Sequence, residues 1–148
     1  MKISLSGAEI QMAAFVGCQR MVENIVRKTK PRYGAEDETD WQINIEGALA
    51  ECALAKHLGK FWAKGETGDL DVGRVNVRST RWESGCLLLH PSDEDDVRFY
   101  LLVGVNGQYR LAGSILAKDG KQEKYWEDRQ KTNRWAYFVP QEALEHGY

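Results

Sequence analysis

Four polar side chains within 28 positions of the chain could together cleave a phosphodiester with the help of a divalent cation. Glu51 lies in an apolar, alanine-rich stretch, Asp71 follows twenty positions later, and Asn76 and Arg78 come soon after it. Such cleavage needs hard oxygen ligands for the metal and a group that stabilises charge at phosphorus. The two carboxylates and the Asn76 amide oxygen could bind Mg²⁺ or Mn²⁺, and the Arg78 guanidinium could clamp a phosphate.

The stretch that carries Glu51 is predicted to form a helix over residues 41–58, with Asp40 as a possible cap and Gly59 as a left-handed end. At about 100° per residue, its apolar side chains form two stripes on different sides of the helix. A helix with two apolar sides is sandwiched, here between an N-terminal helix and a sheet. Glu51 falls between the stripes beside alanines, so we expect a half-buried carboxylate that needs a partner.

The periodicity then changes to two, which predicts strands over residues 70–74 and 75–81. Asn76 and Arg78 are two positions apart and therefore point to one face of the second strand. A bend at the glycine between the two strands would bring Asp71 beside them. We expect these side chains and the helix glutamate to converge in one concave patch, where a cationic neighbour would lower the pKa of Asp71.

Two nearby acids compete for the same roles. Asp69 would share a strand face with Asp71, but Asp71 is flanked by two apolar residues, as a position at the edge of a core would be. Glu46 lies about 140° around the helix from Glu51, so one metal is not expected to bind both from a straight helix.

The rest of the chain is predicted to contain a further helix and several strands. Ser6, with Glu9 three positions later, forms a capping-box pattern, so the first helix should run from there to Lys28. Asn106-Gly107 is a hairpin signal between two apolar runs. The other expected elements are strands over 86–90, 97–105, 108–117 and 136–139, a polar helix over 121–130, and a short turn of helix after Pro140.

One α+β domain spanning residues 1–148 is the expected fold, with a central mixed, largely antiparallel sheet packed against the N-terminal helices. No apolar run is long enough to span a membrane and no signal-peptide pattern is present, so we expect a cytoplasmic protein without a membrane partner. Cys18, Cys52 and Cys86 are too widely spaced for a zinc site and are expected to stay reduced.

Charge limits the kind of nucleic-acid binding that we expect. The formal net charge is −2, which excludes a strongly basic protein that coats DNA. Arg74, Arg78 and Arg81 nevertheless cluster around the candidate site. We expect these three cations to contact nucleic acid.

Three segments carry a family resemblance: residues 46–51 (EGALAE), 71–73 (DVG) and 76–80 (NVRST). Together they resemble the PD-(D/E)xK nuclease superfamily. More narrowly, the chain is similar to small uncharacterised proteins of phages and prophages. The matching stretches are 101–103 (LLV), 113–115 (GSI) and 137–141 (YFVPQ), and the resemblance covers residues 41–144.

The resemblance implies a restriction-endonuclease-like core, DNA as the substrate, Mg²⁺ or Mn²⁺ as the cofactor, and the cytoplasm of the host cell as the location if a phage encodes the chain. By position, the helix glutamate of the superfamily is Glu51 and its metal-binding aspartate is Asp71. Its second acid falls on Asn76 and its lysine on Arg78. An amide oxygen is a weaker ligand than a carboxylate, and an arginine does not readily act as a base.

Two hypotheses from different classes remain open. The first is a divalent-metal-dependent nuclease-like phage protein acting on DNA, with Glu51, Asp71 and Asn76 as metal ligands and Arg78 as the fourth catalytic residue. The second is a catalytically degenerate nuclease fold that binds nucleic acid or a host protein without cleavage. Its motivation is the pair of departures at Asn76 and Arg78.

Overall fold

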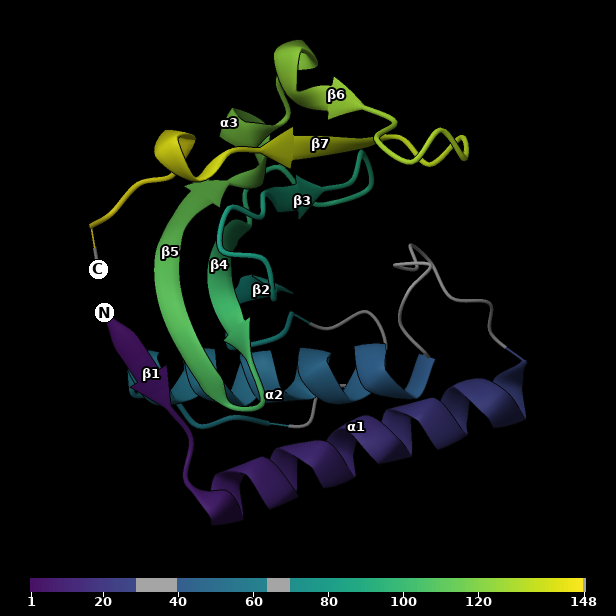
Figure 1. The fold of residues 1–148 in the computed structure, drawn as a ribbon, viewed down its shortest axis with the longest axis vertical. Helices are drawn as coiled ribbons and strands as arrows, with labels where there is room; N and C mark the ends of the chain where they lie inside the picture. The colour runs from purple at the N-terminus through teal and green to yellow at the C-terminus, as the bar shows by residue number, and fades with distance from the viewer. Residues whose placement is uncertain (29–39, 64–69, 148) are drawn as a thin grey trace.

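The computed structural model describes residues 1–28, 40–63 and 70–147 of the chain. In Figure 1 two helices, α1 and α2, lie along one end of a curved sheet, and a smaller sheet crosses its far end. The helices are α1 (Gly7–Arg27), α2 (Asp40–Leu58) and α3 (Ala117–Gly120), with 3₁₀ turns at Glu123–Tyr125 and Gln141–Ala143; the strands are β1 (Lys2–Ser4), β2 (Val75–Thr80), β3 (Leu87–Leu89), β4 (Arg98–Val105), β5 (Gln108–Leu116), β6 (Trp126–Glu127) and β7 (Ala136–Val139).

Helix α1 begins at the predicted capping box. The Ser6 hydroxyl accepts a hydrogen bond from the Glu9 N–H at 3.2 Å, and the Glu9 carboxylate accepts one from the Ser6 N–H at 2.7 Å. Glu9 also accepts from the Lys56 ammonium, and this bond is the largest cause of its pKa of about 2. The helix ends at Lys28, which has a left-handed conformation with φ of 53°. The predicted start and end of this helix are therefore confirmed.

Helix α2 lies between α1 and the larger sheet, as its two apolar stripes predicted. Every residue from Ala48 to Ala55 is buried, and small side chains make up most of this segment. The chain leaves the helix at Gly59, whose φ of 64° is the left-handed conformation that ends many helices. Because α2 is covered on two sides, any polar group on it must find a partner inside the protein.

The larger sheet has the strand order β1-β5-β4-β2. Strand β2 runs parallel to β4, whereas β4 with β5 and β5 with β1 are antiparallel, so the sheet is mixed and the fold is α+β. The β4–β5 hairpin turns at Asn106 and Gly107, both with positive φ, as the sequence predicted. Strand β2 is an edge strand in this order, so one side of its backbone is left for contacts with loops.

Each face of the larger sheet covers its own core. One face, with Val77, Leu102 and Leu111, packs on α2. The other face, with Phe99 and Leu101, packs on the smaller sheet, whose order is β3-β7-β6. Alternate residues of β2 therefore enter different layers of the protein.

Two local predictions are wrong, and one strand was missed. The segment 121–130 is not a helix, since it forms a 3₁₀ turn and strand β6, where Trp126 pairs with Tyr137 and stacks on Trp135 at 5.8 Å. Tertiary pairing overrides its helical composition here. The segment 70–74 is not a strand, because Gly73 at φ of 60° turns the chain so tightly that Val72 pairs with Val75. Strand β1 was not predicted.

One sequence-based expectation lies outside the described residues, namely the competing acid Asp69. Within residues 1–28, 40–63 and 70–147, the structure contains no helix that is both long and apolar enough to cross a membrane.

Candidate functional site

A close contact between the two long helices positions the first acid of the site. At Gly17 of α1, an added Cβ would lie 2.5 Å from the Ile45 Cα of α2, so only glycine allows this approach. Arg20 lies one turn further along α1, and Glu51 lies between the two helices with 7% of its surface exposed. The sequence therefore underestimated the burial of Glu51, which was expected to be half-buried and is buried.

Glu51 is held by Arg20 through two parallel hydrogen bonds. Arg20 Nη1 donates to Glu51 Oε1 at 2.6 Å, and Nη2 donates to Oε2 at 2.8 Å. The Trp62 indole Nε1–H adds a third bond to Oε2 at 3.2 Å. Two-point pairing with a carboxylate raises the pKa of the Arg20 guanidinium, and it compensates the buried charge of Glu51.

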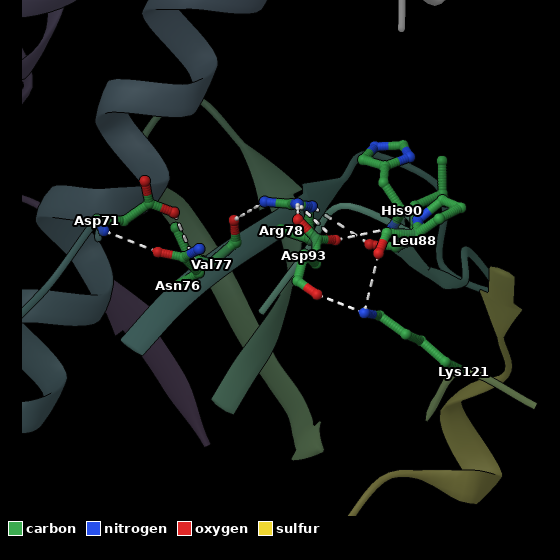
Figure 2. A network of polar contacts seen from close by, with 9 residues as sticks. Asp71, Asn76, Val77, Arg78, Leu88, His90, Asp93 and Lys121 are labelled. Carbon is green, nitrogen blue, oxygen red and sulfur yellow. Dashed lines mark hydrogen bonds and ion pairs between the residues drawn. The ribbon is translucent and has the colours of Figure 1, made fainter. Parts of the chain in front are cut away.

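Asp71 occupies the turn that leads into the edge strand β2. Its backbone N–H donates to Asn76 Oδ1 at 2.9 Å, and its carboxylate oxygen Oδ2 accepts from the Val77 N–H at 2.9 Å (Figure 2). The turn at Gly73 folds the chain back so that residue 71 reaches residues 76 and 77. The predicted proximity of Asp71 and Asn76 is therefore present, through a contact that uses the amide oxygen of Asn76.

The pKa of Asp71 is raised to about 6, because burial disfavours its charged form and the neighbouring charge of Glu51 repels it. The Val77 N–H, Arg78 and Arg20 act in the opposite direction, but they do not outweigh these two causes. The prediction of a lowered pKa is wrong for this reason. The two cations nearby already serve other carboxylates, Glu51 and Asp93.

Arg78 points away from the α2 side of the sheet. Its neighbour Val77 belongs to the core under α2, whereas the Arg78 guanidinium lies 4.7 Å from the centre of the Phe99 ring in the opposite core. Arg78 Nη2 bonds both oxygens of Asp93 at 3.1 and 3.2 Å, and Nε donates to the Leu88 carbonyl at 3.2 Å (Figure 2). The sheet thus separates the Arg78 head group from Glu51.

Asp93 anchors a loop that Lys121 also holds. Besides Arg78, Asp93 accepts from the His90 N–H at 2.7 Å. The Lys121 ammonium donates to the Asp93 carbonyl oxygen (Figure 2). It also donates to the Pro91 carbonyl oxygen and to the Asp95 carboxylate. Three oxygens thus surround the Lys121 ammonium, much as ligands surround a bound cation, and here the cation is a side chain of the protein.

The other expected participants lie elsewhere. Arg74 and Arg81 are exposed beside the two ends of β2. Glu46 accepts from the Tyr109 hydroxyl at 3.0 Å and from the Asn106 N–H at 3.3 Å, so it supports the β4–β5 hairpin, and burial raises the pKa of Tyr109. Glu46 also lines a shallow pocket at the end of β2, with Thr80 and Trp82, and that pocket includes neither Glu51 nor Asp71.

The ligand set does not fit a divalent metal ion. Both oxygens of Glu51 accept from cationic or indole donors, and the Asn76 oxygen accepts from a backbone N–H. In the part of the chain that the structure describes, no group of three or more aspartate, glutamate, histidine or cysteine residues could hold a metal. The Arg20 guanidinium takes the place that a cation would need beside Glu51.

Sequence reasoning missed Arg20, Trp62, Asp93 and Lys121. Arg20 carried a usable signal, because it is a charged residue beside the small and apolar packing positions Ala13, Gly17 and Met21 of α1. A cation on the buried side of a helix calls for a buried acid opposite. The other three residues reach their partners through loops, which no periodicity predicts.

In the comparisons with known proteins, no family model, no curated protein and no solved structure matches this chain.

Proposed function

We propose that this chain is a catalytically degenerate nuclease fold, with a restriction-endonuclease-like core, that binds DNA without cleaving it. The observation that carries the proposal is the two-point pairing of Arg20 with Glu51, at 2.6 and 2.8 Å. Arg20 neutralises the helix glutamate, as a metal ion would, but a guanidinium cannot act as a Lewis acid in cleavage. Asn76 is neutral, so Asp71 is the one carboxylate of the group to which no cation among the described residues bonds directly.

Displacing Arg20 to admit a metal would be costly. Glu51 is 7% exposed, and the Arg20 side chain is only 23% exposed. Breaking a buried pair of this kind leaves an uncompensated charge, which costs about 3–5 kcal/mol. A metal ion at Glu51 would have to recover this energy and also offset the loss of the hydrogen bond that Trp62 donates.

The DNA part of the proposal rests on the family resemblance and on the exposed cations. Arg74 and Arg81 lie near opposite ends of β2 and are exposed, so both can approach a phosphate backbone. Arg78 is 28% exposed and is engaged with Asp93, so we expect it to contribute less to binding than the sequence suggested. Because the net charge is −2, binding depends on this local arrangement of cations.

The test is DNA binding measured by fluorescence anisotropy over a series of salt concentrations. The affinity should fall with salt, and the Arg74→Ala/Arg81→Ala double variant should reduce the log–log salt slope by about 2, because each arginine neutralises one phosphate. Lys118→Ala, at an exposed lysine of α3, is the matched control and should leave the slope unchanged. Binding that ignores both salt and the double variant would remove nucleic acid as the partner and leave a protein target.

A second candidate is the divalent-metal-dependent nuclease, and one observation favours it. The charge of Glu51 is the second cause of the raised pKa of Asp71, so the two carboxylates share one neighbourhood. Plasmid and single-stranded DNA should be incubated with Mg²⁺ or Mn²⁺ and either the wild type or Asp71→Ala. Cleavage by the wild type that Asp71→Ala abolishes would establish this candidate and overturn the first.

A further inference from the structure

Helix α1 carries a stripe of exposed apolar side chains that the single chain does not use. Met12, Phe15, Val22 and Val26 are 51%, 64%, 49% and 75% exposed, and Ile25 beside them is 54% exposed. We call these five residues the α1 stripe. Such side chains are costly to leave in water, at about 25 cal/mol for each Å² of apolar surface.

The α1 stripe lies on the side of the helix away from α2. The residues that pack on α2 are Ala13, Gly17 and Met21, four positions apart. Phe15 and Val22 fall about half a turn from these positions at 100° per residue. In Figure 1, α1 is the outermost layer of the protein, beyond α2. Exposed apolar side chains that gather on one outward face of a helix mark an interaction surface.

The spacing of the stripe indicates that a second helix covers it. Positions 12, 15, 19, 22 and 26 follow one another at intervals of three and four residues, which is the seam of a two-helix coiled coil. The one polar member is Gln19, in the middle of the series. Helix α1 has 21 residues, so it is about 32 Å long, and the seam from position 12 to position 26 covers about four of its turns.

We propose that the α1 stripe is the interface of a homodimer in which two copies of α1 pack antiparallel. The two ends of the seam are complementary in size, because Met12 and Phe15 are large whereas Val22 and Val26 are small. An antiparallel pair therefore places large side chains against small ones, which fills the interface, and a parallel pair places like against like. A polar residue at the middle of a seam can fix such a register.

The helix dipoles favour the same arrangement. In an antiparallel pair the two dipoles run in opposite directions, which is favourable, whereas in a parallel pair like ends meet. Glu9 in the first turn of α1 is already paired with Lys56 of its own chain at 2.8 Å, so the arrangement does not depend on its charge. A second copy of this chain thus satisfies the size pattern and the dipole pattern at once.

Sedimentation of the wild type over a range of protein concentrations tests the dimer. We expect a monomer–dimer equilibrium with a dimer at high concentration. Phe15→Glu should raise the dimer dissociation constant by about 100-fold or more, since it places two buried charges in the interface. Phe61→Glu is the matched control, because Phe61 is 91% exposed and lies outside the α1 stripe, and it should leave dimerisation unchanged.

Circular dichroism of Phe15→Glu should match the wild type, since the substituted side chain is exposed in the monomer. A wild type that stays monomeric at several hundred micromolar would overturn the proposal. So would a dimer that Phe15→Glu leaves intact.

Disulfide cross-linking tests the direction of the helices, in a background with Cys18→Ser and Cys86→Ser. Gln19→Cys should form a dimer on mild oxidation because the symmetry axis passes near this position. Val26→Cys should not, because its two copies are 14 residues, or about 21 Å, apart along the axis. Cross-linking of Val26→Cys as fast as Gln19→Cys would overturn the antiparallel arrangement.

Discussion

Arg20 of α1 and Glu51 of α2 form a two-point ion pair between helices whose backbones meet at Gly17. The pair joins the first two layers of the fold and also decides the chemistry of the candidate site. Because the guanidinium already neutralises Glu51, the acid next to β2, Asp71, is left without a bonded cation among the described residues. The Arg20–Glu51 pair therefore accounts both for the contact between α1 and α2 and for the proposed loss of catalysis.

Arg20→Ala should destabilise the protein by about 3 kcal/mol, because it leaves the buried Glu51 carboxylate with only the Trp62 indole as a partner among the described residues. Urea unfolding followed by circular dichroism measures this change. Glu127→Ala is the control, since its pair with Arg129 is exposed and should contribute only about 0–1 kcal/mol. Equal effects of the two substitutions would mean that the Arg20–Glu51 pair is no stronger than a surface pair.

Asp71 should make the protein less stable as pH rises from about 4 to about 6. The folded state keeps a proton on Asp71 up to a pKa of about 6, whereas the unfolded chain releases it near the ordinary aspartate pKa of 3.8. The unfolded state then binds fewer protons, so the free energy of unfolding falls with pH, by about 3 kcal/mol in total for this shift.

Asp71→Asn removes this titration and keeps an oxygen that can accept from the Val77 N–H. The unfolding free energy of the variant minus that of the wild type should therefore be larger at pH 7.5 than at pH 4. Urea unfolding of both proteins at the two pH values gives the difference directly. A difference that does not change with pH would show that burial of Asp71 does not disfavour its charge.

Lys121→Met should cost about 1–3 kcal/mol, because it leaves the Pro91 and Asp93 carbonyl oxygens without their donor. Lys121 is only 14% exposed, whereas Lys118 is 53% exposed and 4.0 Å from Asp96. Lys118→Met should accordingly change the unfolding free energy by no more than about 0.5 kcal/mol. Thermal unfolding of the two variants side by side would show whether Lys121 holds the loop, and equal melting temperatures would argue that it does not.

Gly17→Ala should destabilise the protein by about 1–3 kcal/mol, because the new methyl group would meet the α2 backbone at Ile45. Gly47→Ala in α2 meets nothing within 4 Å and should instead stabilise its helix by about 0.5–1 kcal/mol. Opposite signs in the two unfolding free energies are expected. The same sign for both would contradict the close helix contact.

The elements with a clear period or a local capping signal could be predicted from the sequence. The Ser6–Glu9 box, the two stripes of α2 and the Asn106-Gly107 turn each depend on residues close together in the chain, and the structure contains all three. The segment 121–130 and strand β1 could not be predicted, because their form depends on distant strands, β7 and β5, that supply their hydrogen-bond partners.

The candidate site was predictable only in part for a similar reason. The turn at Gly73 brings Asp71 to Asn76 through five positions of chain, so local reasoning found that pair. The partners of Glu51 and Arg78 come from α1 and from the loop at Asp93, and pairings of this range cannot be read from one segment. The pKa of Asp71 depends on those partners, which is why the sequence predicted a lowered pKa where the structure has a raised one.

The most direct test of the central claim is a titration of the wild-type protein with Mn²⁺, followed by the electron paramagnetic resonance signal of the free ion. If Arg20 takes the place of a metal at Glu51 and Asp71, the free Mn²⁺ signal should rise in proportion to added metal, with no saturable site at millimolar concentration. One saturable site per chain that Asp71→Asn abolishes would contradict the account and would identify the pair of carboxylates as a metal site.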